Sequence, residues 1–270
     1  MIIGGDEMQS FVQKVYYSAE PFLKKSHFHD CHEVVLVLKG QVQICVNEAS
    51  YTAGRGDIFL FSRYENHSVV VLSEEYERYV LHIDPGIVNG ESPVYSLLSD
   101  RPIGFCNVIS TLPQLDNMES VFKRLVEERD SHNKLTNEMQ QLTVMQLLIL
   151  IYRCMPTGFA GRYDDVVVGI KRQFENHYSQ PHTLAELSKQ YNISPSALSH
   201  RFRAATGMSV MEYLLSCRMA SAKRMLAGTQ MGIGEIVERC GFSDNSNFSR
   251  TFKALNGMSP TDFRKKYTAE

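Results

Sequence analysis

The last third of the chain repeats itself at an interval of 50 residues. Residues 199–209 read SHRFRAATGMS, and residues 249–259 read SRTFKALNGMS. Upstream, Leu187 corresponds to Ile236 at an offset of 49, so the second copy carries one extra residue near Asp244. Self-similarity at a fixed period indicates a supersecondary unit that occurs twice, and this constrains the fold more than any other feature of the sequence.

Each copy predicts two short helices joined by a tight turn. In the first copy, residues 184–190 form an amphipathic helix and residues 196–206 a second one. Thr183 is the expected cap of the first helix, and Asn192 suits the left-handed position of the turn. Ser194 is the expected cap of the second helix, with Pro195 at its first position, and Gly207 ends that helix.

The second copy has a turn residue, a cap and a stop residue at matching positions. Gly241 takes the turn, Ser243 is the expected cap, and Gly257 ends the second helix. In both copies the second helix carries apolar residues for one face, namely Leu198 and Phe202, then Phe248 and Phe252. Two matching units predict tandem helix-turn-helix motifs. The alternative is a plain helical bundle with a solvated charged face.

The charge of the chain is divided between its two parts. Residues 165–270 hold 14 basic and 9 acidic side chains, a net charge of +5. The preceding residues hold 14 basic and 21 acidic side chains, a net charge of −7. A basic segment joined to an acidic one indicates that only the repeat-bearing part meets a polyanion.

The repeat region resembles the DNA-binding domain of the AraC/XylS family of bacterial regulators. The similarity lies in residues 233–243, 248–253 and 257–260, and residues 210–226 resemble the long helix that joins the two units in that family. The resemblance implies two recognition helices set about one DNA turn apart.

The resemblance also implies which side chains meet DNA. Base contacts are expected from Ser196, Ser199 and His200 in the first unit and from Ser246, Asn247 and Arg250 in the second. The short side chains of the first unit suggest that it reads fewer bases. Phosphate contacts are expected from Arg201, Arg203 and Lys253, although each could equally be a solvated surface charge.

The front part of the chain reads differently. Short alternating segments between residues 34 and 83, separated by Gly and Asn, predict a small antiparallel β-barrel or sandwich. Helical spacing follows at residues 116–131 and 133–155. We therefore expect an α+β chain with a barrel and helical dimerisation segment in 1–157, a linker at 158–164, and an all-α DNA-binding domain in 165–270.

The second of these helices has a seven-residue rhythm at Leu135, Leu142 and Ile149. Such a rhythm suits a seam between two helices, and we expect it to join two copies of the chain. The alternative is that the two helices only close one end of the barrel.

A histidine-rich segment precedes the strands. His27, His29 and Glu33 look like the first cupin motif, and Gly56-Asp57 followed by His67 resembles the second. The sequence departs from that second motif, because its usual proline is Ser62 and its usual glycine is Tyr64.

Such a barrel is expected to hold one small effector, a sugar or other metabolite in view of the resemblance. The expected polar lining is His27, His29, Glu33, His67, Arg78 and His82, with Tyr16 possible from an early strand. We expect no cofactor. The alternative is a divalent transition metal on His27, His29, Glu33 and His67, in a cupin enzyme fused to a DNA-binding module.

These features predict an effector-responsive transcription regulator that is not an enzyme. The expected partners are double-stranded DNA, a small effector, RNA polymerase and a second copy of the chain. The first residues lack the features of a signal peptide, no apolar run reaches the length of a membrane span, and the six cysteines are scattered, so a cytoplasmic protein is expected. A regulator with no effector is a further alternative.

Overall fold

The chain divides into two compact units, Met1–Tyr163 and Asp164–Glu270. The computed structural model describes residues 12–20, 23–27, 29–46, 49–84, 94, 97–98, 101, 107–131, 133–156 and 164–267. The predicted linker therefore lies outside the described residues except for Asp164.

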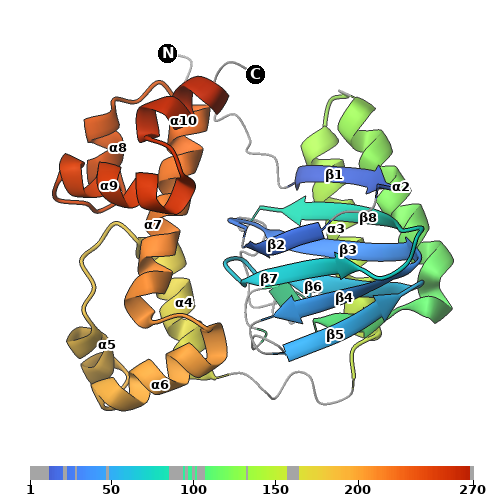
Figure 1. Ribbon diagram of the computed structural model, residues 1–270, viewed down its shortest axis with the longest axis horizontal. Coiled ribbons are helices and arrows are strands. Elements are labelled where there is room, and N and C mark those ends of the chain that lie inside the picture. The colour runs from blue at the N-terminus through green and yellow to red at the C-terminus, as the bar shows by residue number, and fades with distance from the viewer. Residues whose placement is uncertain are drawn as a thin grey trace. The chain divides into compact units, whose positions relative to one another are not determined.

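Two antiparallel sheets form the first unit (Figure 1). The five-stranded sheet has the order β1-β8-β3-β6-β9, and the four-stranded sheet has the order β2-β7-β4-β5. The strands are β1 Val12–Ser18, β2 Leu23–His27, β3 His32–Lys39, β4 Gln41–Val46, β5 Ala49–Gly54, β6 Asp57–Phe61, β7 His67–Val71, β8 Glu77–Ile83 and β9 Val108–Ser110. This architecture confirms the predicted cupin-like fold, with β1 as the early strand of Tyr16 and with β2 and β9 added to the strands expected from the sequence.

The strands of the five-stranded sheet have apolar side chains on both faces. On β3, Val35 and Val37 point toward the four-stranded sheet, whereas Val34 and Leu36 belong to the core on the other side. This outer core is completed by α2 (Leu115–Ser131) and α3 (Thr136–Arg153), which pack on each other and on β1. A sheet that is buried on both faces gives the nearly continuous apolar runs seen in β3 and β6.

The helix α3 begins later than the predicted residue 133. Leu135 has a φ of +67° and precedes the helix, which starts at Thr136. Leu135 is therefore outside the helical stretch that carries Leu142 and Ile149, and it is 69% exposed.

The second unit consists of helices in its described residues. They are α4 Asp165–His177, α5 Leu184–Gln190, α6 Pro195–Thr206, α7 Val210–Gly228, α8 Ile233–Arg239, α9 Asn245–Asn256 and α10 Pro260–Tyr267. The pairs α5–α6 and α8–α9 are the two predicted helix-turn-helix motifs, and α7 joins them (Figure 1). Among the described residues of the chain, no helix is both long and apolar enough to cross a membrane.

Candidate DNA-binding surface and effector cavity

The first helix-turn-helix is fixed by side-chain caps at both of its helices. Thr183 and Glu186 form a reciprocal capping box at the start of α5. The hydroxyl of Ser194 accepts a hydrogen bond from the Ala197 amide at the start of α6. Asn192 has a φ of +53° in the turn. These positions confirm the predicted caps and turn residue of the first copy.

The second helix-turn-helix differs from the prediction at one residue. Its cap is Asp244 rather than Ser243, and the Asp244 carboxylate accepts hydrogen bonds from the Ser246 and Asn247 amides. The extra residue in this copy moves the start of α9 one position along the chain. The same bonds hold the pKa of Asp244 below its ordinary value. They also place a negative charge at the helix end where a phosphate would otherwise be favoured.

Gly241 is required by two features of the second turn. Its φ is +75°, and a Cβ at this position would lie 2.4 Å from the carbonyl oxygen of Ser179. Nearby, Arg218 of α7 donates hydrogen bonds to the carbonyl oxygens of Tyr178 and Gln180. The segment after α4 is thus fixed against α7, and the second turn packs closely on it.

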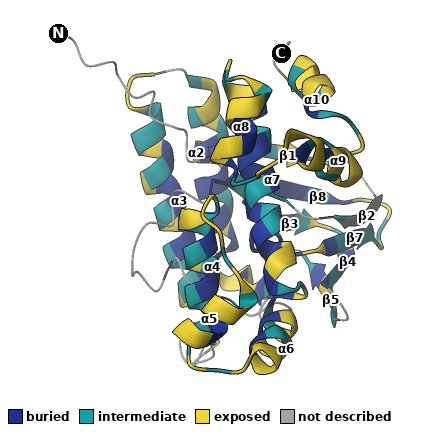
Figure 2. Cartoon of the chain, turned by 90° about the vertical axis from the view of Figure 1, so that its left-hand side faces the viewer, coloured by how far each residue is buried: buried dark blue, intermediate teal, exposed yellow. Residues whose placement is uncertain are grey.

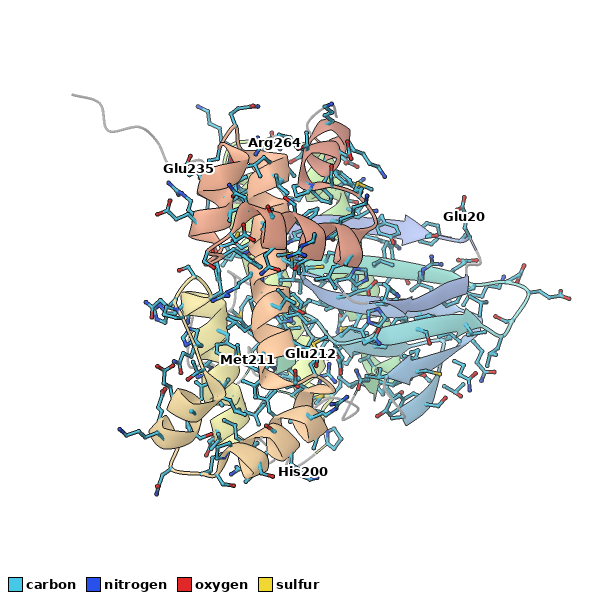
Figure 3. All side chains as sticks on the ribbon, turned by 60° about the vertical axis from the view of Figure 1, so that its left-hand side comes forward. Glu20, His200, Met211, Glu212, Glu235 and Arg264 are labelled. Atoms are coloured by element: carbon cyan, nitrogen blue, oxygen red, sulfur yellow. The ribbon has the colours of Figure 1, made fainter. Side chains whose placement is uncertain are left out.

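Each second helix buries its aromatic face and exposes its polar face. Phe202 of α6 and Phe248 and Phe252 of α9 are fully buried. Figure 2 shows exposed residues along the outer faces of both helices, and His200 projects outward from α6 in Figure 3. Of the nine predicted DNA contacts, Ser199 is half-buried and the others are exposed: Ser196, His200, Arg201, Arg203, Ser246, Asn247, Arg250 and Lys253.

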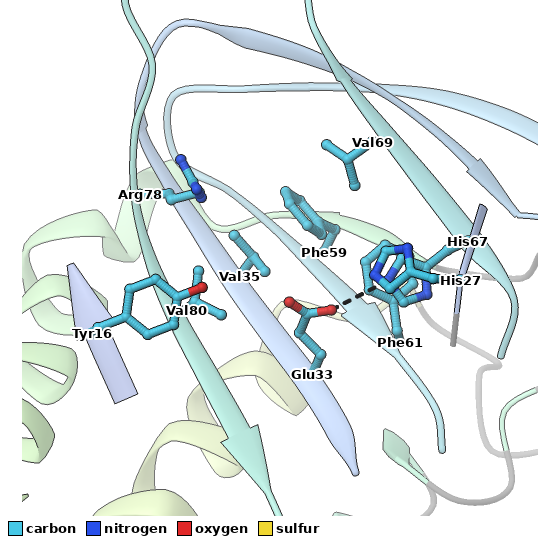
Figure 4. A pocket seen from close by; sticks show the side chains of 10 residues that line it. All are labelled: Tyr16, His27, Glu33, Val35, Phe59, Phe61, His67, Val69, Arg78 and Val80. Carbon is cyan, nitrogen blue, oxygen red and sulfur yellow. Dashed lines mark ion pairs between the residues drawn. The ribbon is translucent and has the colours of Figure 1, made fainter. Parts of the chain in front are cut away.

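The first unit contains a cavity of about 220 Å³ between its two sheets. Six strands line it, and four of them contribute two residues each at a spacing of two, as expected for one face of a strand. The lining residues are Tyr16, His27, Glu33, Val35, Phe59, Phe61, His67, Val69, Arg78 and Val80 (Figure 4).

Glu33 is the centre of a histidine cluster at one end of the cavity. Its carboxylate oxygens lie 3.2 Å from Nε2 of His29 and 3.3 Å from Nε2 of both His67 and His82. His27 joins the cluster through a 3.1 Å contact between its Nε2 and that of His29. Burial alone would raise the pKa of Glu33, but the hydrogen bonds from the three imidazoles lower this pKa well below its ordinary value.

A buried polar network fixes the turn that carries His67. The Glu65 carboxylate accepts hydrogen bonds from Arg101 at 2.8 Å, from the Ser62 amide at 2.8 Å and from Asn107 at 3.1 Å. Within the turn, Tyr64 has a φ of +64°. The position where the cupin motif has glycine therefore keeps the left-handed backbone that favours glycine.

Two family models together cover most of the chain. A model described as an AraC-like ligand binding domain matches residues 12–148, and a model described as a helix-turn-helix domain matches residues 187–266. The first of these spans half of the chain. The chain belongs to the AraC family.

Its relatives support this assignment along most of its length. The HTH-type transcriptional activator RhaR of Escherichia coli O139:H28 is 26% identical over 259 residues, which cover 88% of this chain and 86% of the relative. RhaR of Salmonella schwarzengrund is 25% identical over 269 residues, which cover 96% of this chain and 93% of the relative. ToxT of Vibrio cholerae, solved with an unsaturated fatty acid bound, has a TM-score of 0.58 at 16% identity and covers 99% of each chain, so the fold is shared.

The cavity of this AraC-family regulator differs in part from the predicted one. Tyr16, His27, Glu33, His67 and Arg78 line it, whereas His29 and His82 contact Glu33 without forming the wall. The prediction missed the apolar lining: Val35, Phe59, Phe61, Val69 and Val80. A two-residue step from Glu33, His67 and Arg78 along their strands would have found three of these five residues.

Among the predicted phosphate contacts of the AraC-family DNA-binding unit, Arg201 stands apart. Its guanidinium donates two hydrogen bonds to the carboxylate of Asp164, which is also the N-cap of α4. Burial opposes ionisation of Asp164, but the bonds from Arg201 and from the Val166 and Val167 amides lower its pKa.

Proposed function

We propose that this AraC-family chain is a cytoplasmic regulator whose DNA binding changes when a small metabolite occupies the cavity of the first unit. The observation that carries the proposal is the cavity itself, which combines polar groups with apolar walls in the unit that precedes the helix-turn-helix motifs. A ligand that binds one arrangement of the regulator better than another shifts the population toward it.

We further propose that α6 and α9 enter successive major grooves. Base contacts come from Ser196, Ser199, His200, Ser246, Asn247 and Arg250, and phosphate contacts come from Arg203, Lys253 and Arg201. Exposure supports the assignment for all of them but Ser199, which is half-buried, and Arg201 must exchange its Asp164 partner for a phosphate. The Asp244 carboxylate occupies the N-terminus of α9 and disfavours a phosphate there. Side chains of the second motif are therefore the better candidates for phosphate binding.

A second copy of the chain is the proposed partner of α3. Met139 and Leu142 lie three residues apart on this helix and are 51% and 67% exposed, and Leu135 adjoins them with 69% exposure. Exposed apolar side chains at helical spacing are typical of a helix–helix seam. The proposed homodimer would present two pairs of recognition helices to DNA. RNA polymerase is a further proposed partner, since the RhaR relatives are named transcriptional activators.

A metal ion at the histidine cluster is the second candidate role of the cavity. Ligand atoms of His27, His29 and His67 lie within 4.8 Å of one another, as do those of His29, Glu33 and His82. The carbonyl of Glu65 can only accept, so Nδ1 of His67 donates to it at 2.9 Å and Nε2 is left turned toward Glu33. Metal-binding histidines commonly donate one ring N–H to a carbonyl in this way, and a divalent transition metal, which suits this donor set, would replace the hydrogen bond between Nε2 of His67 and Glu33.

The metal-dependent cupin enzyme has less support, because the relatives are transcription regulators. Elemental analysis of the purified chain separates the two roles. One equivalent of metal per chain, together with turnover of a small substrate, would favour the enzyme. A metal-free preparation that still binds a metabolite would favour the regulator.

Thermal-shift screening of the full-length protein against metabolites tests the proposed function. A ligand that binds only the native state raises the unfolding temperature. Each hit is then added to DNA-binding titrations, where we expect the affinity for the preferred duplex to change. A ligand that binds without changing DNA affinity would contradict the regulatory coupling, and DNA binding indifferent to every metabolite would indicate a regulator without an effector.

A further inference from the structure

The cavity has two polar ends of different character, separated by apolar walls. In Figure 4, Arg78 and Tyr16 lie on one side, His27 and His67 lie on the other, Val35 and Phe59 stand between them, and the Glu33 carboxylate lies below, paired with His67. An occupant that fills the space must therefore match one polar group at each end and present apolar surface in the middle.

Arg78 provides the cation at its end of the cavity. The residue is 6% exposed, and β8 positions it so that it lines the space with Val80 two residues on. Its Nη1 donates a 2.9 Å hydrogen bond to the carbonyl oxygen of Glu20, and its guanidinium lies 4.8 Å from the centroid of the Tyr76 ring. These contacts hold the planar group in place, and arginine remains charged even where burial lowers its pKa.

The opposite end does not offer a free anion. Both carboxylate oxygens of Glu33 are already contacted by imidazoles, from His29 and His67 on Oε2 and from His82 on Oε1. A cationic ligand would meet Arg78 at one end and a carboxylate engaged by three histidines at the other. A ligand with its negative charge at the Arg78 end pairs with this cation, and the imidazole contacts of Glu33 offset the charge of the second carboxylate in the cavity.

We propose that the effector is a small carboxylate with an apolar body and a hydrogen-bonding group at its far end. The inference rests on the proposed effector-binding function and names the chemical class of the ligand. The carboxylate pairs with the fixed fork of Arg78, the apolar body packs between Phe59 and Val35, and the distal group meets His27. The cavity of about 220 Å³ suits a small ligand of this kind.

The experiment compares matched probes on the full-length protein in the presence of EDTA. The carboxylates are hexanoate, 6-hydroxyhexanoate, phenylacetate and 4-hydroxyphenylacetate. The controls are hexanamide, phenylacetamide, hexylamine and galactose. We expect the carboxylates to raise the unfolding temperature and the 4-hydroxy and 6-hydroxy forms to do so most, with little effect from the controls. Equal stabilisation by acids and amides, or no shift with any of the four acids, would overturn the proposal.

Variants of Arg78 test whether its positive charge is what binds the carboxylate. We expect Arg78→Met to weaken carboxylate binding by roughly tenfold or more and Arg78→Lys to weaken it less. Arg55→Met, at an exposed turn of the same unit, is the matched control. Carboxylate binding that survives Arg78→Met would overturn the proposal. Stabilisation by galactose alone would overturn it while leaving the effector-binding function intact.

Discussion

Arg201 of α6 donates two hydrogen bonds, each 2.8 Å long, from Nε and Nη2 to the carboxylate of Asp164. One oxygen of the same carboxylate also accepts from the Val166 and Val167 amides at the start of α4. The residue at the entrance of the DNA-binding unit is thereby tied to the first predicted recognition helix. An arginine in this pairing is less available to a phosphate than an unengaged one.

Releasing Arg201 should strengthen DNA binding. Asp164→Asn keeps a capping side chain and removes the negative charge, so we expect a several-fold tighter complex and a steeper dependence on salt, because one more cation can meet phosphate. Titrations at several salt concentrations measure both. Unchanged affinity and an unchanged salt dependence would show that the pairing with Asp164 does not limit the contact of Arg201 with DNA.

Asp164→Ala should also cost stability, since it removes the cap. We expect a loss of roughly 1 kcal/mol in the unfolding free energy of the second unit, with Asp164→Asn losing less. The ion pair adds little because Arg201 is solvent-exposed. Chemical denaturation of the two variants beside the wild type gives the difference, and equal stability of all three proteins would contradict the capping role.

The stabilisation by Asp164 should depend on pH in a defined direction. Its pKa is lower in the folded chain than the ordinary 3.8, so the unfolded chain takes up the proton first as the pH falls. The stabilisation is therefore complete above about pH 5 and is lost as the pH falls through the folded pKa. We expect the stability gap between wild type and Asp164→Ala to be constant from neutral pH to about pH 5 and to narrow below it. A gap that widens on acidification would contradict this sign.

Arg250 and Lys253 should have different roles on α9. The planar fork of Arg250 can bond both acceptors of a guanine edge, which is worth about 1–3 kcal/mol of discrimination. Arg250→Ala is expected to weaken the preferred duplex by roughly tenfold or more and to leave scrambled DNA nearly unaffected. Lys253→Ala should weaken both alike and make the salt slope shallower by about one unit. Parallel losses for Arg250→Ala would make this residue a phosphate contact.

Leu142→Asp should convert the proposed dimer to monomers. An introduced carboxylate at a 67% exposed position costs the isolated unit little but disfavours an apolar seam. Sedimentation of the full-length protein reports the state, with Asn117→Asp on exposed α2 surface as the control. A dimeric Leu142→Asp variant would place the interface elsewhere.

Local patterns predicted the elements whose causes are local. The caps at Thr183 and Ser194 follow from side chains that bond an amide three residues along, and the turn at Asn192 and the stop at Gly207 follow from residue types that tolerate a positive φ. The cap of α9 was misplaced by one residue because Ser243 and Asp244 are both good caps, and the extra residue of the second copy makes Asp244 the one that precedes the helix. The late start of α3 at Thr136 was missed because Leu135 fits the seven-residue rhythm but has a left-handed backbone.

Long-range polar contacts could not be read from the sequence. Arg101 and Glu65 form a buried ion pair across 36 residues, and neither lies in a motif that predicts burial of charge. The histidine cluster was found because the cupin resemblance brings distant residues together. The apolar walls from β6 were missed because Phe59 and Phe61 look like ordinary core residues, whereas Val35, Val69 and Val80 follow from the alternation of the strands that carry Glu33, His67 and Arg78.

We propose that the two helix-turn-helix units of this chain read DNA together. Selection of the full-length protein on a library of random duplexes, followed by sequencing, tests it most directly. We predict an enriched site in which each chain reads two conserved blocks whose centres lie about one helical turn apart, roughly 10–10.5 base pairs, with the more strongly conserved block of each pair losing its specificity in Arg250→Ala. Enrichment of a single block, or of no sequence at all, would contradict joint reading of DNA by the two units.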